Sequence, residues 1–294
     1  MWKAEHLIAG IKVEISSKAG DASGFLPTRM GHFAPRSHTS HPDIVIALNH
    51  DEVVQADPLK HFFPSKFVLT SRGDELLFEG INGKKRLLAV INPREARGEM
   101  AVPSLRGPWR VVEEEEAVRE AVQAFMLACL QLRLLDEGGT LLHAAGVVIE
   151  GEAYAFVGHT RAGKTTLVRS FHSSEVLGDD LVAVRELADR QRLFGTPWPG
   201  REGGKVAYGG LPLRAVFILH RELPPGLRYM SAAEAVAELA VDAPRLGHKG
   251  EESKLLENIS RLADAVPIFK LSLRLEDDVA AWLKDFSLEG GKGP

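Results

Sequence analysis

The sequence has little of several features that would place it in a special class. It holds a single cysteine, Cys129, so no disulfide can form within the chain. No apolar run approaches the roughly 20 residues that a membrane-spanning helix needs. Charged residues interrupt residues 1–8, where a signal peptide would need an apolar core. We therefore expect a cytoplasmic protein with no membrane partner.

The charge balance argues against another class. Lysine and arginine together number 36 and aspartate and glutamate 40, for a net charge of −4. Because nucleic-acid binding usually needs an excess of positive charge, we expect no nucleic-acid partner. The chain is 45% hydrophobic and 26% charged, which is typical of a globular protein, and 294 residues can form one large or two ordinary domains.

Residues 158–166 (GHTRAGKTT) match the phosphate-binding pattern G-x-x-x-x-G-K-[ST], and we call them the phosphate loop. In such a loop, backbone N–H groups curl around an anionic phosphate at the start of a helix. Lys164 would reach the β- and γ-phosphates, and the hydroxyl of Thr165 would bind the Mg²⁺ of the nucleotide. The predicted nucleotide-binding residues are Gly158, His159, Thr160, Arg161, Ala162, Gly163, Lys164, Thr165 and Thr166.

The surroundings of the phosphate loop support the motif. The apolar run 153–157 predicts a buried strand before the loop, and residues 166–171 predict a helix after it. Strand, loop and helix in that order is the arrangement the motif requires. The alternative is a glycine turn with an incidental lysine.

Two adjacent aspartates follow the predicted strand 176–177, only fifteen residues beyond Lys164. One of Asp179 and Asp180 could help hold Mg²⁺ while the other accepts a proton from an attacking hydroxyl. The apolar strand 215–219 supplies no such aspartate, because it is followed by His-Arg-Glu. The alternative is that the aspartate pair is only a polar turn between strands.

His143 lies in residues 140–148, which are otherwise largely apolar. We expect this run to form a single strand that precedes the phosphate loop in the sequence. A histidine in such a place is often a core residue whose hydrogen bonds are satisfied. It could instead face the phosphates, and the sequence leaves both open. Residues 113–116 are four glutamates that we expect in the first turn of a helix ending before Gly138.

The segments 142–147, 158–166 and 177–180 together resemble the catalytic domain of HPr kinase/phosphorylase. The chain is more closely similar to the bacterial HPr-kinase-related proteins, which share a fold with phosphoenolpyruvate carboxykinase. Residues 193–200 and 211–219 strengthen the likeness to that related group, which extends from about residue 138 to 285. The first 110 residues do not resemble the N-terminal domain of the HPr enzyme.

The resemblance implies roles for individual residues. Asp179 would be the base that deprotonates the acceptor serine, His143 an active-site residue, and Lys164 and Thr165 the phosphate and metal contacts. The family loop usually has Ser-Gly where this chain has Thr160-Arg161. The positive charge of Arg161 would assist phosphate binding, or its side chain would hinder the tight turn of the loop. The family's metal-binding glutamate is not recognisable, and Glu202 is a weak stand-in.

We therefore expect an α/β protein with a phosphoenolpyruvate carboxykinase-like core, in which helices flank a mixed sheet. The expected parts are a β-rich N-terminal part (1–112) that could recruit the substrate, a connecting helix (113–138), a catalytic domain (139–288) and a disordered tail (289–294). In the N-terminal part, strands are expected at 11–15, 44–48, 67–69, 76–78 and 87–91.

The expected function is an ATP- and Mg²⁺-dependent kinase that phosphorylates a hydroxyl, most simply a serine, of a small protein or peptide. Lys164, Asp179 and His143 would be the catalytic residues, with Thr165, Asp180 and Glu202 as candidate metal ligands. The alternatives are a nucleotide-binding regulatory or assembly protein with little phosphoryl transfer, and a small-molecule kinase. The sequence leaves open the acceptor, including HPr itself, the phosphoryl donor, and whether the chain forms a homo-oligomer.

Overall fold

The computed structural model describes residues 1–18, 20–35, 41–50, 67–82, 85–102, 112–159, 162–172, 175–198, 210–246, 250–274 and 277–286. The chain divides into two compact units, which are described separately. The first comprises Met1–Leu7, Ile11–Arg133 and Leu246–Glu251, and the second comprises Ile8–Gly10, Leu134–Arg245 and Glu252–Pro294. In the part of the chain that is described, no helix is both long and apolar enough to cross a membrane.

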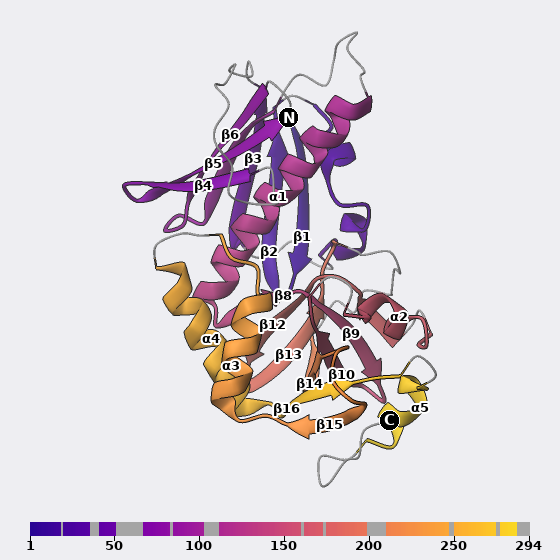
Figure 1. The fold of residues 1–294 in the computed structure, drawn as a ribbon. Helices are drawn as coiled ribbons and strands as arrows, with labels where there is room; N and C mark the ends of the chain where they lie inside the picture. Colours follow the sequence, from indigo (N-terminus) through magenta and orange to yellow (C-terminus); the bar gives the residue numbers. More distant parts are fainter. Residues whose placement is uncertain are drawn as a thin grey trace. The chain divides into compact units, whose positions relative to one another are not determined.

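The N-terminal unit is built on a sheet whose strand order, among the described residues, is β1-β2-β3-β7-β6-β5-β4 (Figure 1). The strands are β1 (Trp2–Ile8), β2 (Ile11–Ser17), β3 (Ile44–His50), β4 (Phe67–Arg72), β5 (Glu75–Asn82), β6 (Lys85–Asn92) and β7 (Arg97–Val102), and η1 (Ser23–Phe25) and η2 (Met30–Phe33) are short 3-10 helices. Strand β3 pairs in parallel with both β2 and β7, and the pairs from β4 to β7 are antiparallel. The five strands expected here are confirmed, each with wider bounds.

Helix α1 (Val112–Asp136) begins and ends close to the expected positions. Cys129 is buried, and burial raises the pKa of its thiol, as expected of a core cysteine rather than a reactive one. A Cβ on Gly98 of strand β7 would lie 2.8 Å from both Cys129 Sγ and Phe125 Cζ. This glycine lets α1 approach strand β7 closely. Glycine also weakens the sequence pattern that indicates a strand, so β7 was not predicted.

The C-terminal unit holds the phosphate loop. Its strands are β8 (Gly139–Leu142), β9 (Ala144–Ile149), β10 (Glu152–Val157), β11 (Val176–Gly178), β12 (Val182–Leu187), β13 (Arg190–Gly195), β14 (Leu211–Leu219), β15 (Gly226–Tyr229) and β16 (Ile268–Ser272). Its helices are α2 (Lys164–Val168), α3 (Ala232–Asp242), α4 (Glu251–Ala265) and α5 (Val279–Lys284). Among the described residues the strand order is β11-β9-β10-β14-β13-β12-β8, with β16 pairing with β14 and β15 (Figure 1).

The central strands of this sheet are buried on both faces. Alternate residues of β10 and β14 enter two different apolar clusters, so Phe156 and Phe217 belong to one while Ala155 and Val216 belong to the other. Helices α3 and α4 contribute to the cluster of Ala155, and α2 and α5 to the cluster of Phe156. This double burial explains the continuous apolar runs of both strands. Sheets flanked by helices make the protein an α/β protein, as expected.

The prediction of a single strand over residues 140–148 is wrong. Residues 140–148 form two strands, β8 and β9, that are interrupted at His143. The reason is that Leu142 pairs with Val182 of β12, whereas Ala144 pairs with Val157 of β10. The chain therefore leaves one ladder and joins another at the histidine.

Two further details of the C-terminal unit differ from the sequence-based expectation. The helix after the phosphate loop begins at Lys164 and ends at Val168, rather than covering 166–171. Strands β13 and β15 were not predicted, and the expected tail lies outside the described residues. The expected strands 153–157, 176–177 and 215–219 are present as β10, β11 and β14, with shifts of at most a few residues at their ends.

We predict that Gly195→Ala destabilises the C-terminal unit by about 1–3 kcal/mol, because a Cβ there would lie 2.7 Å from the backbone oxygen of Leu177 in β11. Chemical denaturation would measure the change. Gly24→Ala is the control, since no atom lies within 4 Å of the position of its Cβ. Equal stability of the two variants would contradict the close approach of β13 to β11.

Candidate functional site

The candidate site lies at one edge of the C-terminal sheet, where three parallel strands end. Val157 of β10 pairs with Ile218 of β14, and Leu219 of β14 pairs with Leu271 of β16. The carboxyl ends of these strands therefore meet at the same edge. In open α/β sheets this is the edge at which ligands bind.

The expected catalytic residues come to this same edge from the other side of β10. Strand β9 runs antiparallel to β10 and begins at Ala144, opposite Val157, so His143 lies next to the start of the phosphate loop. Strand β11 runs antiparallel to β9 and ends at Gly178, directly before Asp179 and Asp180. Pairing between strands thus brings together three segments that are separate in the sequence.

The two glycines of the motif are needed for different physical reasons. A Cβ on Gly158 would lie 2.8 Å from the Cβ of Ala162, so a side chain there would prevent the loop from closing. Gly163, which precedes helix α2, has φ of +106°, in the left-handed region that favours glycine. The loop also closes through a 3.0 Å hydrogen bond from Ala162 N to His159 O.

Lys164 is buried, with 6% of its surface exposed, and its ammonium group points back into the phosphate loop. The ammonium donates hydrogen bonds to the carbonyl oxygens of Gly158 and, at 3.4 Å, of His159. Burial lowers the pKa of Lys164, while the negative charges of Asp180 and Asp242 oppose that shift. The loop therefore holds a buried ammonium group against two of its own carbonyl oxygens.

His143 and Asp180 form a contact in which His143 Nε2 lies 3.0 Å from Asp180 Oδ1. The hydrogen bond from His143 lowers the pKa of Asp180, burial opposes the shift, and the positive charge of Lys164 adds to it. The side chain of His143 is 31% exposed. His143 is therefore only partly buried and contacts Asp180, and its expected position facing the phosphates stays a prediction.

The two aspartates lie in different surroundings. Asp179 is almost fully buried, at 2% exposure, whereas the side chain of Asp180 is 59% exposed. Adjacent carboxyl groups in unlike environments are suited to different chemical tasks. Both lie in the bend between β11 and β12, so the polar-turn alternative describes their backbone correctly without excluding a chemical role.

Two of the three expected metal ligands are described, Thr165 in the first turn of α2 and Asp180 in the bend after β11. Among the described residues, no three histidine, cysteine or acidic side chains cluster closely enough to hold a metal by themselves. Mg²⁺ does not require such a cluster, because it commonly takes one or two protein oxygens together with substrate phosphates and water. One hydroxyl and one carboxylate therefore fit Mg²⁺ on a nucleotide. Thr160, Arg161 and Glu202 lie outside the described residues.

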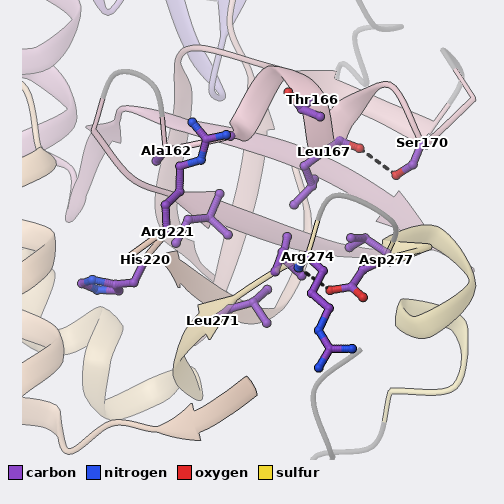
Figure 2. Close-up of a pocket in the computed structure, with 13 residues that line it drawn as sticks. Ala162, Thr166, Leu167, Ser170, His220, Arg221, Leu271, Arg274 and Asp277 are labelled. Carbon is purple, nitrogen blue, oxygen red and sulfur yellow. Dashed lines mark hydrogen bonds between the residues drawn. The ribbon is translucent and has the colours of Figure 1, made fainter. Parts of the chain in front are cut away.

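An open pocket of about 210 Å³ adjoins the phosphate loop on the side of β14 and β16 (Figure 2). It is lined by Ala162, Gly163, Thr166, Leu167, Ser170, Leu219, His220, Arg221, Leu271, Leu273, Arg274, Asp277 and Val279. Sequence reasoning missed most of these residues. The available signal was a basic residue shortly after each of two apolar strands, Arg221 after β14 and Arg274 after β16.

The fold and this edge define an α/β protein with a glycine-rich loop, a buried lysine and an acidic pair at the carboxyl ends of its strands. No protein-family model and no curated protein matches the chain. Among solved structures, the Hpr(Ser) kinase/phosphatase from Coxiella burnetii aligns with 49% of this chain and 86% of its own, at 11% identity and a TM-score of 0.30. This is a distant structural likeness, and at that TM-score it carries no argument about the activity of this chain.

We predict that the effect of Asp180→Asn on stability depends on pH. The pKa of Asp180 is lowered from its ordinary value of 3.8, so its carboxylate stabilises the fold above that pH and loses this contribution as the pH falls through the lowered value. At pH 7 the variant should be less stable by at most about 1 kcal/mol, because the side chain is largely exposed. Urea denaturation near neutral pH and near pH 2 would measure the difference.

The control is Asp264→Asn, which removes an exposed carboxyl of helix α4. The stability difference for Asp180→Asn should shrink towards zero at the lower pH. A difference of the same size at both pH values would show that the contact with His143 does not stabilise the carboxylate.

Proposed function

We propose that the chain is a kinase that transfers the γ-phosphate of ATP to a hydroxyl group, with a serine of a small protein or peptide as the acceptor. The observation that carries the proposal is a single electrostatic unit at the sheet edge. Lys164 lies buried within a glycine-rich loop and is attracted to Asp180, which His143 contacts at 3.0 Å. Phosphoryl transfer depends chiefly on positioning and charge neutralisation of this kind.

The phosphate loop would bind the donor. Backbone N–H groups at the start of α2 and the ammonium of Lys164 would face the phosphate oxygens, replacing the carbonyl contacts that Lys164 makes to Gly158 and His159. Thr165 and Asp180 would hold Mg²⁺, which, when bound, neutralises charge on the phosphates.

Asp179 would act as the general base. Its carboxylate accepts the proton of the acceptor hydroxyl as that oxygen bonds to the γ-phosphorus. The bond between the γ-phosphorus and the β–γ bridging oxygen breaks, and ADP leaves with the electron pair. His143 would hold Asp180 in place beside the phosphates.

The proposal also covers the class of the acceptor and the type of core fold. The resemblance of residues 138–285 to HPr-kinase-related proteins supports a phosphoenolpyruvate carboxykinase-like core and a serine acceptor. The N-terminal part, expected at 1–112, would recruit that protein or peptide. We propose a cytoplasmic setting and leave the oligomeric state open.

The second candidate is a nucleotide-binding protein without phosphoryl transfer. Two features of the sequence favour it: Thr160-Arg161 replaces the Ser-Gly of the family loop, and the family's metal-binding glutamate is not recognisable. In that case Asp179 and Asp180 would be a structural turn. The two candidates differ in whether an acceptor exists.

We predict that Asp179→Asn lowers phosphoryl transfer by about 10²- to 10⁴-fold, because the general base is lost. The same variant should bind ATP·Mg²⁺ within about 3-fold of wild type, since Asp179 does not contact the donor in this mechanism. Lys164→Ala should weaken ATP binding instead. Labelling of a host lysate with γ-labelled ATP and Mg²⁺ would measure transfer, and calorimetry would measure binding.

A labelled protein or peptide that appears with wild type and not with Asp179→Asn would support the kinase and identify its acceptor. If wild type binds ATP·Mg²⁺, Lys164→Ala does not, and nothing is labelled, the nucleotide-binding alternative takes its place. If neither the wild type nor the lysine variant binds ATP, both candidates are wrong.

A further inference from the structure

The pocket beside the phosphate loop lies on the opposite side of β10 from the acidic pair. The strand order β11-β9-β10-β14, with β16 next to β14, places His143 and Asp179 at the β9 and β11 side and the pocket at the β14 and β16 side. Neighbouring strands are about 4.8 Å apart, so the ends of β14 and β16 lie roughly 5–10 Å across the sheet from the end of β10. A donor whose reacting phosphate faces Asp180 would direct its other end into this pocket.

The pocket is continuous with the phosphate loop. Ala162 and Gly163 of the loop and Thr166 of helix α2 form part of its wall. Figure 2 labels Ala162 and Thr166, which lie on either side of the start of α2 in the sequence. A ligand bound in the loop would therefore border the pocket at Ala162, Gly163 and Thr166.

The lining of the pocket is apolar at its floor and polar at its rim. The apolar residues are Leu167, Leu219, Leu271, Leu273 and Val279, and the polar ones include Ser170, Arg221, Arg274 and Asp277. An apolar floor with a few polar groups is typical of sites for flat organic rings. The volume of about 210 Å³ is smaller than the roughly 300 Å³ at which pockets for whole drug-sized ligands begin, so it suits one part of a ligand. Inorganic phosphates have no apolar surface to bury there.

Two arginines stand at the ends of the neighbouring strands. In Figure 2, Arg221 extends from the end of β14 towards Ala162, and Arg274 extends the other way from the end of β16. The backbone of Arg274 is fixed by a 2.6 Å hydrogen bond from its N–H to Asp277 Oδ2. A guanidinium can bind a phosphate or lie flat against an aromatic ring. Arg221 is placed for the first role, and Arg274, at the outer rim, for the second.

We propose that this pocket binds the base and ribose of the phosphoryl donor, so that the donor is a nucleoside triphosphate and not an inorganic polyphosphate. Leu273 contributes to the apolar floor under the base, and Arg274 covers the face of the base. The inference rests on the proposed function, because it assumes that the phosphate loop binds the phosphates of the same molecule.

The test compares the affinity of the full-length protein for ATP and for inorganic triphosphate, each with Mg²⁺, by calorimetry. Wild type should bind ATP at least about 10-fold more tightly, since only ATP fills the pocket. Arg274→Ala and Leu273→Ala should each weaken ATP binding by about 3- to 10-fold and leave triphosphate binding within about 2-fold. Lys164→Ala should weaken the binding of both ligands.

Arg228→Ala is the matched control, because Arg228 is an exposed arginine of the same unit that pairs with Glu234 outside the pocket. Arg274 is also exposed, so its variant should fold even if Leu273→Ala loses stability. Two results would overturn the assignment of the pocket to the nucleoside: equal affinity of wild type for ATP and triphosphate, or an equal loss of affinity for both ligands in Arg274→Ala. Neither result would contradict phosphate binding by the phosphate loop. Failure of wild type to bind either ligand would overturn the proposed function, and the pocket assignment with it.

Discussion

The parallel pairing of β10 with β14, and of β14 with β16, is the constraint on which the rest of the C-terminal unit depends. These pairs align three strand ends at one edge, and burial on both faces leaves little room for a shift in register. A slip of one residue would turn Phe156 and Phe217 into the opposite core. The position of the phosphate loop beside the pocket is therefore set by the packing of the core.

The edge combines charges of opposite sign in a fixed order. The acidic pair lies on one side of the loop, the buried lysine within it, and two arginines on the other side. The attraction between Lys164 and Asp180 and the contact of Asp180 with His143 connect the loop to the acidic side.

Sequence reasoning found the residues whose type and spacing carry the signal. The glycines, Lys164 and the aspartate pair were predicted because the motif and the short interval of 15 residues are local. Arg221, Arg274 and Leu273 were not found, because they belong to the pocket only through strand pairing across about 50 residues of sequence. Strand β7 was missed because Gly98 weakens the strand pattern while serving the packing of α1. The break at His143 was missed because nothing local marks a change of ladder.

The sequence by itself determined that a loop with the phosphate-binding pattern lies between a buried strand and a helix, because glycine geometry and apolar runs are local properties. It also determined the α/β class and most of the strands and helices, since their periodicity is written in neighbouring residues. Only the tertiary structure decided that His143 faces Asp180 and that Asp179 is buried while Asp180 is exposed. It alone placed the pocket beside the loop, because hydrogen-bonded register between distant strands, not local preference, brings those side chains together.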